Sequence, residues 1–153
     1  MAVKIAALRD QLDVDCFKGF DVDLFPTMTI PALNLCADAY GRDAKTGLEV
    51  SLALWNAVFE EGLDVGRLEV LAKIAAKYEL PAPLIEPSQA VLDEYADGKA
   101  HGVRGSPDFY MGDAEFFCPA LDLDHDGDGR LLAGFNIEGF ETFIGVVEVA
   151  VRT

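Results

Sequence analysis

The residues most suggestive of a binding or reaction site are a serine and a proline directly before two short apolar stretches. Ser106 and Pro107 are followed by Asp-Phe-Tyr-Met, a Gly-Asp pair and Ala-Glu-Phe-Phe. Proline has no backbone N–H, so it belongs at the first residue or the edge of a strand. Cis peptide bonds are essentially confined to X-Pro and usually occur in tight turns. We predict a cis Ser106–Pro107 bond at the start of a β-hairpin. A trans bond that simply opens a strand is the alternative.

The three cysteines, Cys16, Cys36 and Cys118, form no C-x-x-C motif. Thiol–disulfide exchange needs an attacking thiolate and a resolving thiol, and this set supplies neither by its spacing. No cysteine and histidine cluster has the spacing of a zinc site. We expect ordinary buried thiols in a reduced, cytoplasmic protein with no metal or cofactor. Pairing of Cys16 with Cys36 stays open, because distance cannot be read from sequence.

Two other polar groups are candidate sites. Asp122 to Gly129 alternates carboxylates like the first half of a calcium loop, but an EF-hand needs Glu at its twelfth position. That position is Ala133 or Phe135, so a solvated acidic turn is favoured over a weak cation site. A basic group near the proline could line a site for an acidic substrate or a glutathione carboxylate. Its members are Lys99, His101 and Arg104. Cations that complement a helix C-terminus are the favoured interpretation.

Composition restricts the possible partners. Lys and Arg number 12 against 27 Asp and Glu, a formal net charge of −15, which disfavours nucleic acid and anionic membrane surfaces. The first ten residues are too short and too soon charged for a secretory signal. No apolar run approaches the roughly 20 residues needed to span a bilayer. We therefore expect no membrane and no nucleic-acid partner.

The apolar spacing predicts a mixed α/β chain. Helices are expected over 1–12, 31–40, 48–61, 64–78, 87–103 and 137–151, a strand over 13–20, and the hairpin after Pro107. The region 121–134 is acidic and glycine-rich, and no helix or strand is expected there. The helical stripes predict a buried face. Its members are Leu33, Cys36, Ala37 and Tyr40; Leu48, Leu52, Trp55 and Phe59; Leu68, Leu71, Ala75 and Tyr78; Val91, Leu92, Tyr95, Ala96 and Val103; and Ile137, Phe140, Phe143, Ile144 and Val147.

A helical block between strands, followed by the segment Gly102 to Pro119, resembles the DsbA-like thioredoxin family. The most similar part is His-Gly-Val-Arg-Gly-Ser-Pro, which matches the segment leading into the family's cis-proline. The resemblance implies a single domain over 1–153, with a thioredoxin-like sheet and an all-helical insert at about 31–103. It also implies that Ser106 and Pro107 bind an extended peptide by strand addition.

The chain departs from the family at its beginning. Members start with a strand and then C-x-x-C at a helix N-terminus, and no residue here matches either feature. We expect that the first strand is absent, that the true start lies upstream, and that the chain as given is redox-inactive. The partners implied are a peptide or small thiol substrate. The unfilled sheet makes a homo-oligomer a further hypothesis. A redox-dead binding module and a glutathione-dependent isomerase or transferase of the same fold are the alternatives.

Overall fold

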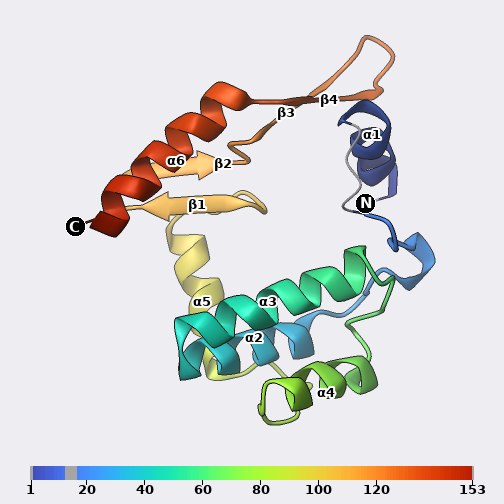
Figure 1. The fold of residues 1–153 in the computed structure, drawn as a ribbon, viewed down its shortest axis with the longest axis vertical. Helices are drawn as coiled ribbons and strands as arrows, with labels where there is room; N and C mark the ends of the chain where they lie inside the picture. Colours follow the sequence, from blue (N-terminus) through green and yellow to red (C-terminus); the bar gives the residue numbers. More distant parts are fainter. Residues whose placement is uncertain (1, 13–16, 153) are drawn as a thin grey trace. The chain divides into compact units, whose positions relative to one another are not determined.

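The computed structural model describes residues 2–12 and 17–152, which form a mixed α/β chain (Figure 1). The helices are α1 (Ala2–Leu12), the 3-10 helix η1 (Val22–Leu24), α2 (Ile30–Arg42), α3 (Ala44–Phe59), α4 (Leu68–Lys77), α5 (Gln89–Ala100) and α6 (Ile137–Arg152). The strands are β1 (Asp108–Met111), β2 (Ala114–Phe117), β3 (Leu121–His125) and β4 (Leu131–Phe135). Two compact units result: residues 15–100, and residues 1–14 together with 101–153.

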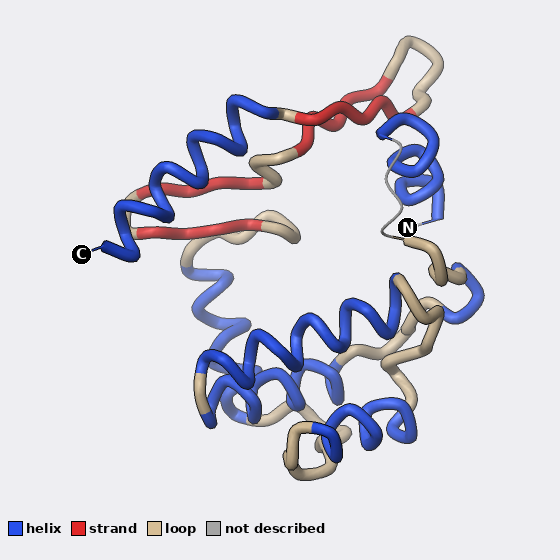
Figure 2. The backbone as a smooth tube through the Cα atoms, viewed as in Figure 1, coloured by secondary structure: helices blue, strands red, loops and turns tan. Residues whose placement is uncertain are grey.

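The 15–100 unit is helical, as the tube in Figure 2 shows for this part of the chain. Pro31 lies in the first turn of α2, where its missing N–H costs nothing. Asp43 caps α3 by accepting a 2.8 Å hydrogen bond from the Thr46 N–H. Helices α2, α3 and α4 share one apolar core. Its most deeply buried members are Leu35, Ala39, Val50, Leu71 and Ala75.

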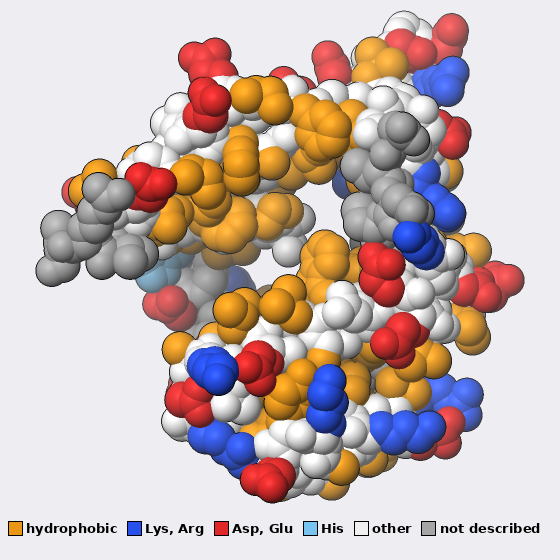
Figure 3. All heavy atoms as spheres, in the orientation of Figure 1, with side chains coloured by type: hydrophobic (Ala, Val, Ile, Leu, Met, Phe, Trp, Pro, Cys, Tyr) orange, Lys and Arg blue, Asp and Glu red, His pale blue; other side chains and the backbone are white. Residues whose placement is uncertain are grey.

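The buried face of α3 is not the predicted one. Leu48, Leu52 and Trp55 are 55%, 54% and 61% exposed, and apolar side chains gather at the surface over α3 (Figure 3). The buried face consists instead of Gly47, Val50, Leu54, Ala57 and Val58. A Cβ on Gly47 would overlap the ring of Tyr40, so this smaller face allows α2 to come close. Because α3 is apolar on both faces, periodicity alone could not choose between them.

Several other positions that were predicted to be buried are exposed in the structure. Of the five positions expected to be buried on the helix predicted over 87–103, only Val91 is buried, and the other four are exposed. Five of the positions predicted to be buried on α2, α4 and α6 are at least 43% exposed. They are Leu33, Tyr40, Leu68, Ile137 and Phe140. Ile144 on α6 is exposed too. The prediction was right for Leu71 and Ala75 on α4.

The second unit contains two antiparallel two-stranded sheets, β1–β2 and β3–β4. The β1–β2 hairpin and α6 confirm their predictions. The acidic turn predicted over 122–129 is shorter than expected, and the strands that flank it were missed: residues 121–125 and 131–135 pair as the β3–β4 hairpin. Its tight turn is held by Asp126, whose Oδ1 accepts from the N–H groups of Asp128 and Arg130 at 3.0 and 2.8 Å. Leucines alternate with aspartates along β3, which is the pattern of a strand. The prediction missed this pattern because the whole region is rich in acidic residues and glycine.

The strand predicted over 13–20 lies partly outside the described residues, which omit 13–16. Residues 17–19 form a turn, and the Gly19 N–H donates to the Phe59 carbonyl at 3.2 Å. None of the described helices is long and apolar enough to cross a bilayer. The helices and the two small sheets confirm the mixed α/β class, and a thioredoxin-like sheet stays a prediction.

Candidate functional site

Ser106 and Pro107 lie at the entrance to the β1–β2 hairpin, and both are exposed. The Ser106–Pro107 bond is cis, as predicted. The Pro107 carbonyl accepts a 3.0 Å hydrogen bond from the Cys118 N–H at the far end of β2. Pro107 is therefore fixed at the first rung of the hairpin, and Ser106 directly precedes it.

The hairpin register decides which backbone groups of β1 are unpaired. Asp108 pairs with Phe117, Phe109 with Phe116, Tyr110 with Glu115, and Met111 with Ala114. Antiparallel pairs alternate between hydrogen-bonded and non-hydrogen-bonded, and the Pro107–Cys118 rung is bonded. Asp108 and Tyr110 therefore occupy non-hydrogen-bonded pairs, and their N–H and C=O groups point to the outer edge of β1. Among the described strands, β1 pairs with β2 alone.

The tight turn of this hairpin is the predicted Gly-Asp pair. Gly112, at the first central position, has a φ of 59°. A positive φ there is typical of the type II′ turn, whose twist matches that of the flanking strands. A glycine is needed at this position because other residues rarely adopt such a backbone conformation.

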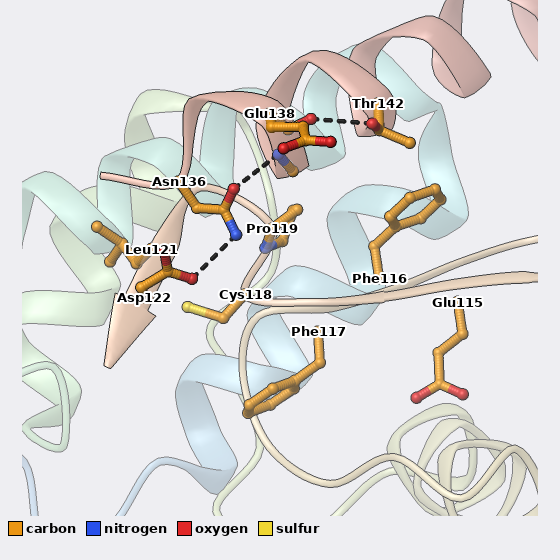
Figure 4. A pocket seen from close by; sticks show the side chains of 11 residues that line it. Glu115, Phe116, Phe117, Cys118, Pro119, Leu121, Asp122, Asn136, Glu138 and Thr142 are labelled. Carbon is orange, nitrogen blue, oxygen red and sulfur yellow. Dashed lines mark hydrogen bonds between the residues drawn. The ribbon is translucent and has the colours of Figure 1, made fainter. Parts of the chain in front are cut away.

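One face of the hairpin is covered by α6. The ring of Phe143 lies 4.7 Å from the ring of Phe109 and 5.4 Å from that of Phe116, measured between centroids. Figure 4 shows Phe116 on the α6 side of β2 and Phe117 on the opposite side. This packing gives the hairpin the apolar support that an isolated two-stranded sheet lacks.

The opposite face carries a polar layer. Arg104 forms a 2.5 Å ion pair with Glu115, and its guanidinium lies 4.9 Å from the centre of the Phe117 ring. Asp108 Oδ2 accepts from the Arg104 N–H at 3.2 Å and from the Tyr110 hydroxyl at 3.3 Å. Because Arg104 is paired with a carboxylate, it is poorly placed to contribute to the basic site considered from sequence.

Burial affects two polar groups of this layer, the Tyr110 hydroxyl and Asp108 Oδ1. Burial, followed by the carboxylates of Asp108 and Glu115, raises the pKa of Tyr110, so its hydroxyl remains a neutral donor. Asp108 Oδ1 is buried and has no hydrogen-bond partner among the described residues. The ring of His101 lies 5.4 Å from that of Tyr110. The charged and hydroxyl groups of this layer are largely paired with one another, which favours a structural or binding role for the layer.

A cavity of about 500 Å³ lies between the end of β2, the start of β3 and the first turns of α6. Asn136 joins two of these elements: its Oδ1 accepts from the Gly139 N–H at 2.7 Å, and its Nδ2 donates to Asp122 Oδ1 at 2.9 Å (Figure 4). Cys118 lines the cavity as a free thiol. Burial raises the pKa of the Cys118 thiol, and the Lys4 ammonium opposes this only in part. A mainly protonated thiol is a weak nucleophile.

The remaining candidates from the sequence do not assemble into a site. No group of three or more potential metal ligands occurs among the described residues. Cys36 is a free thiol, 3.6 Å from the Ser51 hydroxyl, and Cys16 lies outside the described residues. Lys99 lies over the Tyr95 ring, 5.6 Å from its centre.

No protein-family model, curated protein or solved structure matches this chain. The site is thus defined by its own geometry. Sequence reasoning placed Ser106 and Pro107 at the start of β1, but it missed the outward backbone groups of Asp108 and Tyr110. It also missed the Arg104–Glu115 pair. Hydrogen-bonded and non-hydrogen-bonded pairs alternate along a hairpin, starting from its turn. This alternation, counted from the two-residue turn, could have identified the outward backbone groups of Asp108 and Tyr110 from the sequence.

Proposed function

We propose that this chain belongs to a DsbA-like thioredoxin-fold protein, and that these 153 residues, which contain no C-x-x-C, bind an extended peptide along the outer edge of β1. The observation that carries this proposal is the pairing of β1 with β2 alone among the described strands. A strand edge presents a row of unpaired donors and acceptors that an extended chain can satisfy. Strand addition uses this edge for recognition.

The position of Ser106 and Pro107 supports the same site. Both residues are exposed and continue the line of β1 into the loop before it. The outward N–H and C=O groups of Asp108 and Tyr110 would pair with every second residue of the peptide. The α6 side of the hairpin is packed, so the hairpin can keep its shape while a third strand is added.

The chemistry of the cysteines argues for binding rather than thiol exchange. These 153 residues contain no C-x-x-C. The Cys118 thiol has a raised pKa, and exchange requires a thiolate with a nearby resolving thiol. We therefore expect no turnover in an insulin-reduction assay. Turnover above background would contradict this assignment.

Amide hydrogen exchange with a thiol-free peptide tests the binding site. The probe is the insulin B chain, reduced and S-carboxymethylated, which is extended and cannot take part in redox chemistry. At saturating peptide, exchange at the Asp108 and Tyr110 amides should slow at least tenfold, since both amides become hydrogen-bonded. The Glu115 and Phe117 amides, which face the outer edge of β2, serve as internal controls and should be unchanged.

Two substitutions at one position separate the backbone donor from the side chain. Tyr110→Pro removes the outward N–H and leaves the hydrogen bonds of β1 to β2 in place. Tyr110→Val removes the phenol and keeps the N–H. Binding should be lost in the proline variant and retained in the valine variant. Equal loss in both, or peptide protection confined to β2, would exclude this edge. A peptide-free dimer in light scattering, with the Tyr110 amide already protected, would assign the edge to a second copy instead.

A further inference from the structure

We propose that the cavity between α2 and α3 binds a small, uncharged aromatic or aliphatic molecule. All residues that line this cavity belong to the 15–100 unit, and none belongs to β1. Its volume is about 370 Å³. Ligand pockets in proteins are mostly apolar and range from about 300 to 1,000 Å³, so the size is sufficient for a compact ligand.

The walls of the cavity are built from aromatic and aliphatic side chains of three elements. Phe25 comes from the loop after η1, Leu33 from α2, and Trp55 and Phe59 from α3. The Trp55 and Phe59 rings are 4.7 Å apart between centroids, and Phe59 is in turn 5.9 Å from Phe20. These ring contacts hold the walls in place, so the cavity exists before a ligand arrives.

The charge of the lining restricts the chemistry of the ligand. About a quarter of the chain is charged, yet none of the twelve lining residues is Asp, Glu, Lys, Arg or His. An ion placed there would lose its hydration without gaining a partner. The cavity therefore selects against charged molecules.

The polar groups of the lining are few and lie on α2, α3 and the residue before α2. Thr29 precedes α2, and the Cys36 thiol lies 3.6 Å from the Ser51 hydroxyl. Burial raises the pKa of the Cys36 thiol, which keeps this pair uncharged. One hydroxyl or carbonyl group on a ligand could be accommodated by these residues.

The size of the cavity favours a small molecule over a protein segment. A protein interface usually covers about 800 Å² on each partner, far more than the twelve residues that line this cavity can offer.

Trp55 is the single tryptophan of the chain, so its fluorescence reports directly on this cavity. The test titrates the full chain with N-phenyl-1-naphthylamine, an uncharged probe. We expect saturable binding with one site and quenching of Trp55. The sulfonated analogue 8-anilino-1-naphthalenesulfonate should bind at least about tenfold more weakly, because its charge has no partner.

A filling substitution locates the binding site. Ser51→Leu, which places extra volume in the cavity, should weaken the naphthylamine by about tenfold or more. Ala76→Leu on the exposed face of α4 is the matched control and should leave binding unchanged. Circular dichroism establishes that both variants are folded.

A second readout needs no substitution. The bound naphthylamine should slow alkylation of Cys36 by N-ethylmaleimide and leave Cys118 unaffected, as measured by peptide mass spectrometry. The proposal is overturned if binding does not saturate, if Cys36 is not protected, or if Ser51→Leu binds like the parent. A dimer in light scattering, with Cys36 already protected from N-ethylmaleimide in the absence of the naphthylamine, would assign the cavity to a second copy and also overturn the proposal.

Discussion

Gln11 and Leu131, 120 positions apart in the sequence, are joined by a hydrogen bond from the Gln11 Nε2 to the Leu131 carbonyl at 2.9 Å. The same amide accepts a 3.0 Å bond from the Ala133 N–H through its Oε1. One side chain of α1 therefore pairs with two backbone groups along the edge of β4. The amide satisfies groups that a further strand would otherwise occupy.

The Gln11 amide should therefore contribute to stability more than an exposed side chain normally does. Gln11→Ala removes both bonds and should lower the free energy of unfolding by about 1–2 kcal/mol. Gln89→Ala, which loses a single 2.8 Å bond to Asp93 on the surface of α5, is the matched control. Its cost should stay within about 0.5 kcal/mol. Urea unfolding followed by circular dichroism compares the two. Equal costs would show that α1 is held by its apolar contacts alone.

Asn34 should be essential to the loop that connects α4 and α5. It is only 1% exposed, donates to the Leu84 and Glu86 carbonyls at 2.8 and 2.9 Å, and accepts from the Ser88 N–H at 2.9 Å. Asn34→Leu keeps the volume and leaves these backbone groups unpaired, which should cost about 2–4 kcal/mol. Asn56→Leu, at an exposed position of α3, should change the unfolding free energy by less than about 0.5 kcal/mol. A neutral result at position 34 would contradict the role assigned to this amide.

Glu79 should be a position where glycine stabilises the protein. Its φ of 54° lies in the left-handed region, directly after the C-cap of α4. The Arg42 guanidinium donates to the Tyr78 and Glu79 carbonyls, which a glycine would retain. Glu79→Gly should raise stability by about 0.5–1 kcal/mol. Lys73→Gly within α4 should have the opposite sign and cost about 1 kcal/mol. The sign of the change in melting temperature decides the outcome.

Cys36 should show a shifted pH profile of reactivity. Burial raises the pKa of its thiol, and the hydrogen bond with Ser51 opposes this. At a given alkaline pH, less thiolate is present than in an exposed cysteine, so alkylation by iodoacetamide should be slower and its profile displaced to higher pH. Ser51→Ala removes the opposing bond and should displace the profile further. Site-resolved mass spectrometry of quenched samples measures it. A displacement to lower pH would contradict burial as the dominant cause.

The same raised pKa links stability to pH. The folded state favours the neutral thiol, so this contribution is complete below the pKa of the unfolded chain and is lost as pH rises through the folded pKa. Stability should therefore fall in the alkaline range more steeply in the parent than in Cys36→Ala. Urea titrations at a series of alkaline pH values compare the two. Identical slopes of unfolding free energy against pH would show that Cys36 does not contribute to the alkaline loss of stability.

The sequence by itself determined the local features whose cause is local. Pro107 and the Gly112–Asp113 turn specify the start and the reversal of a hairpin within eleven residues, and the structure has both. The helices were predicted because apolar spacing and caps act over one or two turns. The cis Ser106–Pro107 bond was predicted from its local context too, and the structure has it.

Tertiary structure decided which apolar face is buried and which polar groups meet. Helix α3 is apolar on two sides, and only the fit of Gly47 against Tyr40 selects the side that packs on α2. The other apolar side of α3, which carries Trp55, is therefore exposed. Trp55 forms part of the wall of a cavity that no local sequence pattern indicates. Likewise, the bond between Gln11 and Leu131 depends on the path of the chain over 120 positions, a distance at which sequence spacing carries no geometric information.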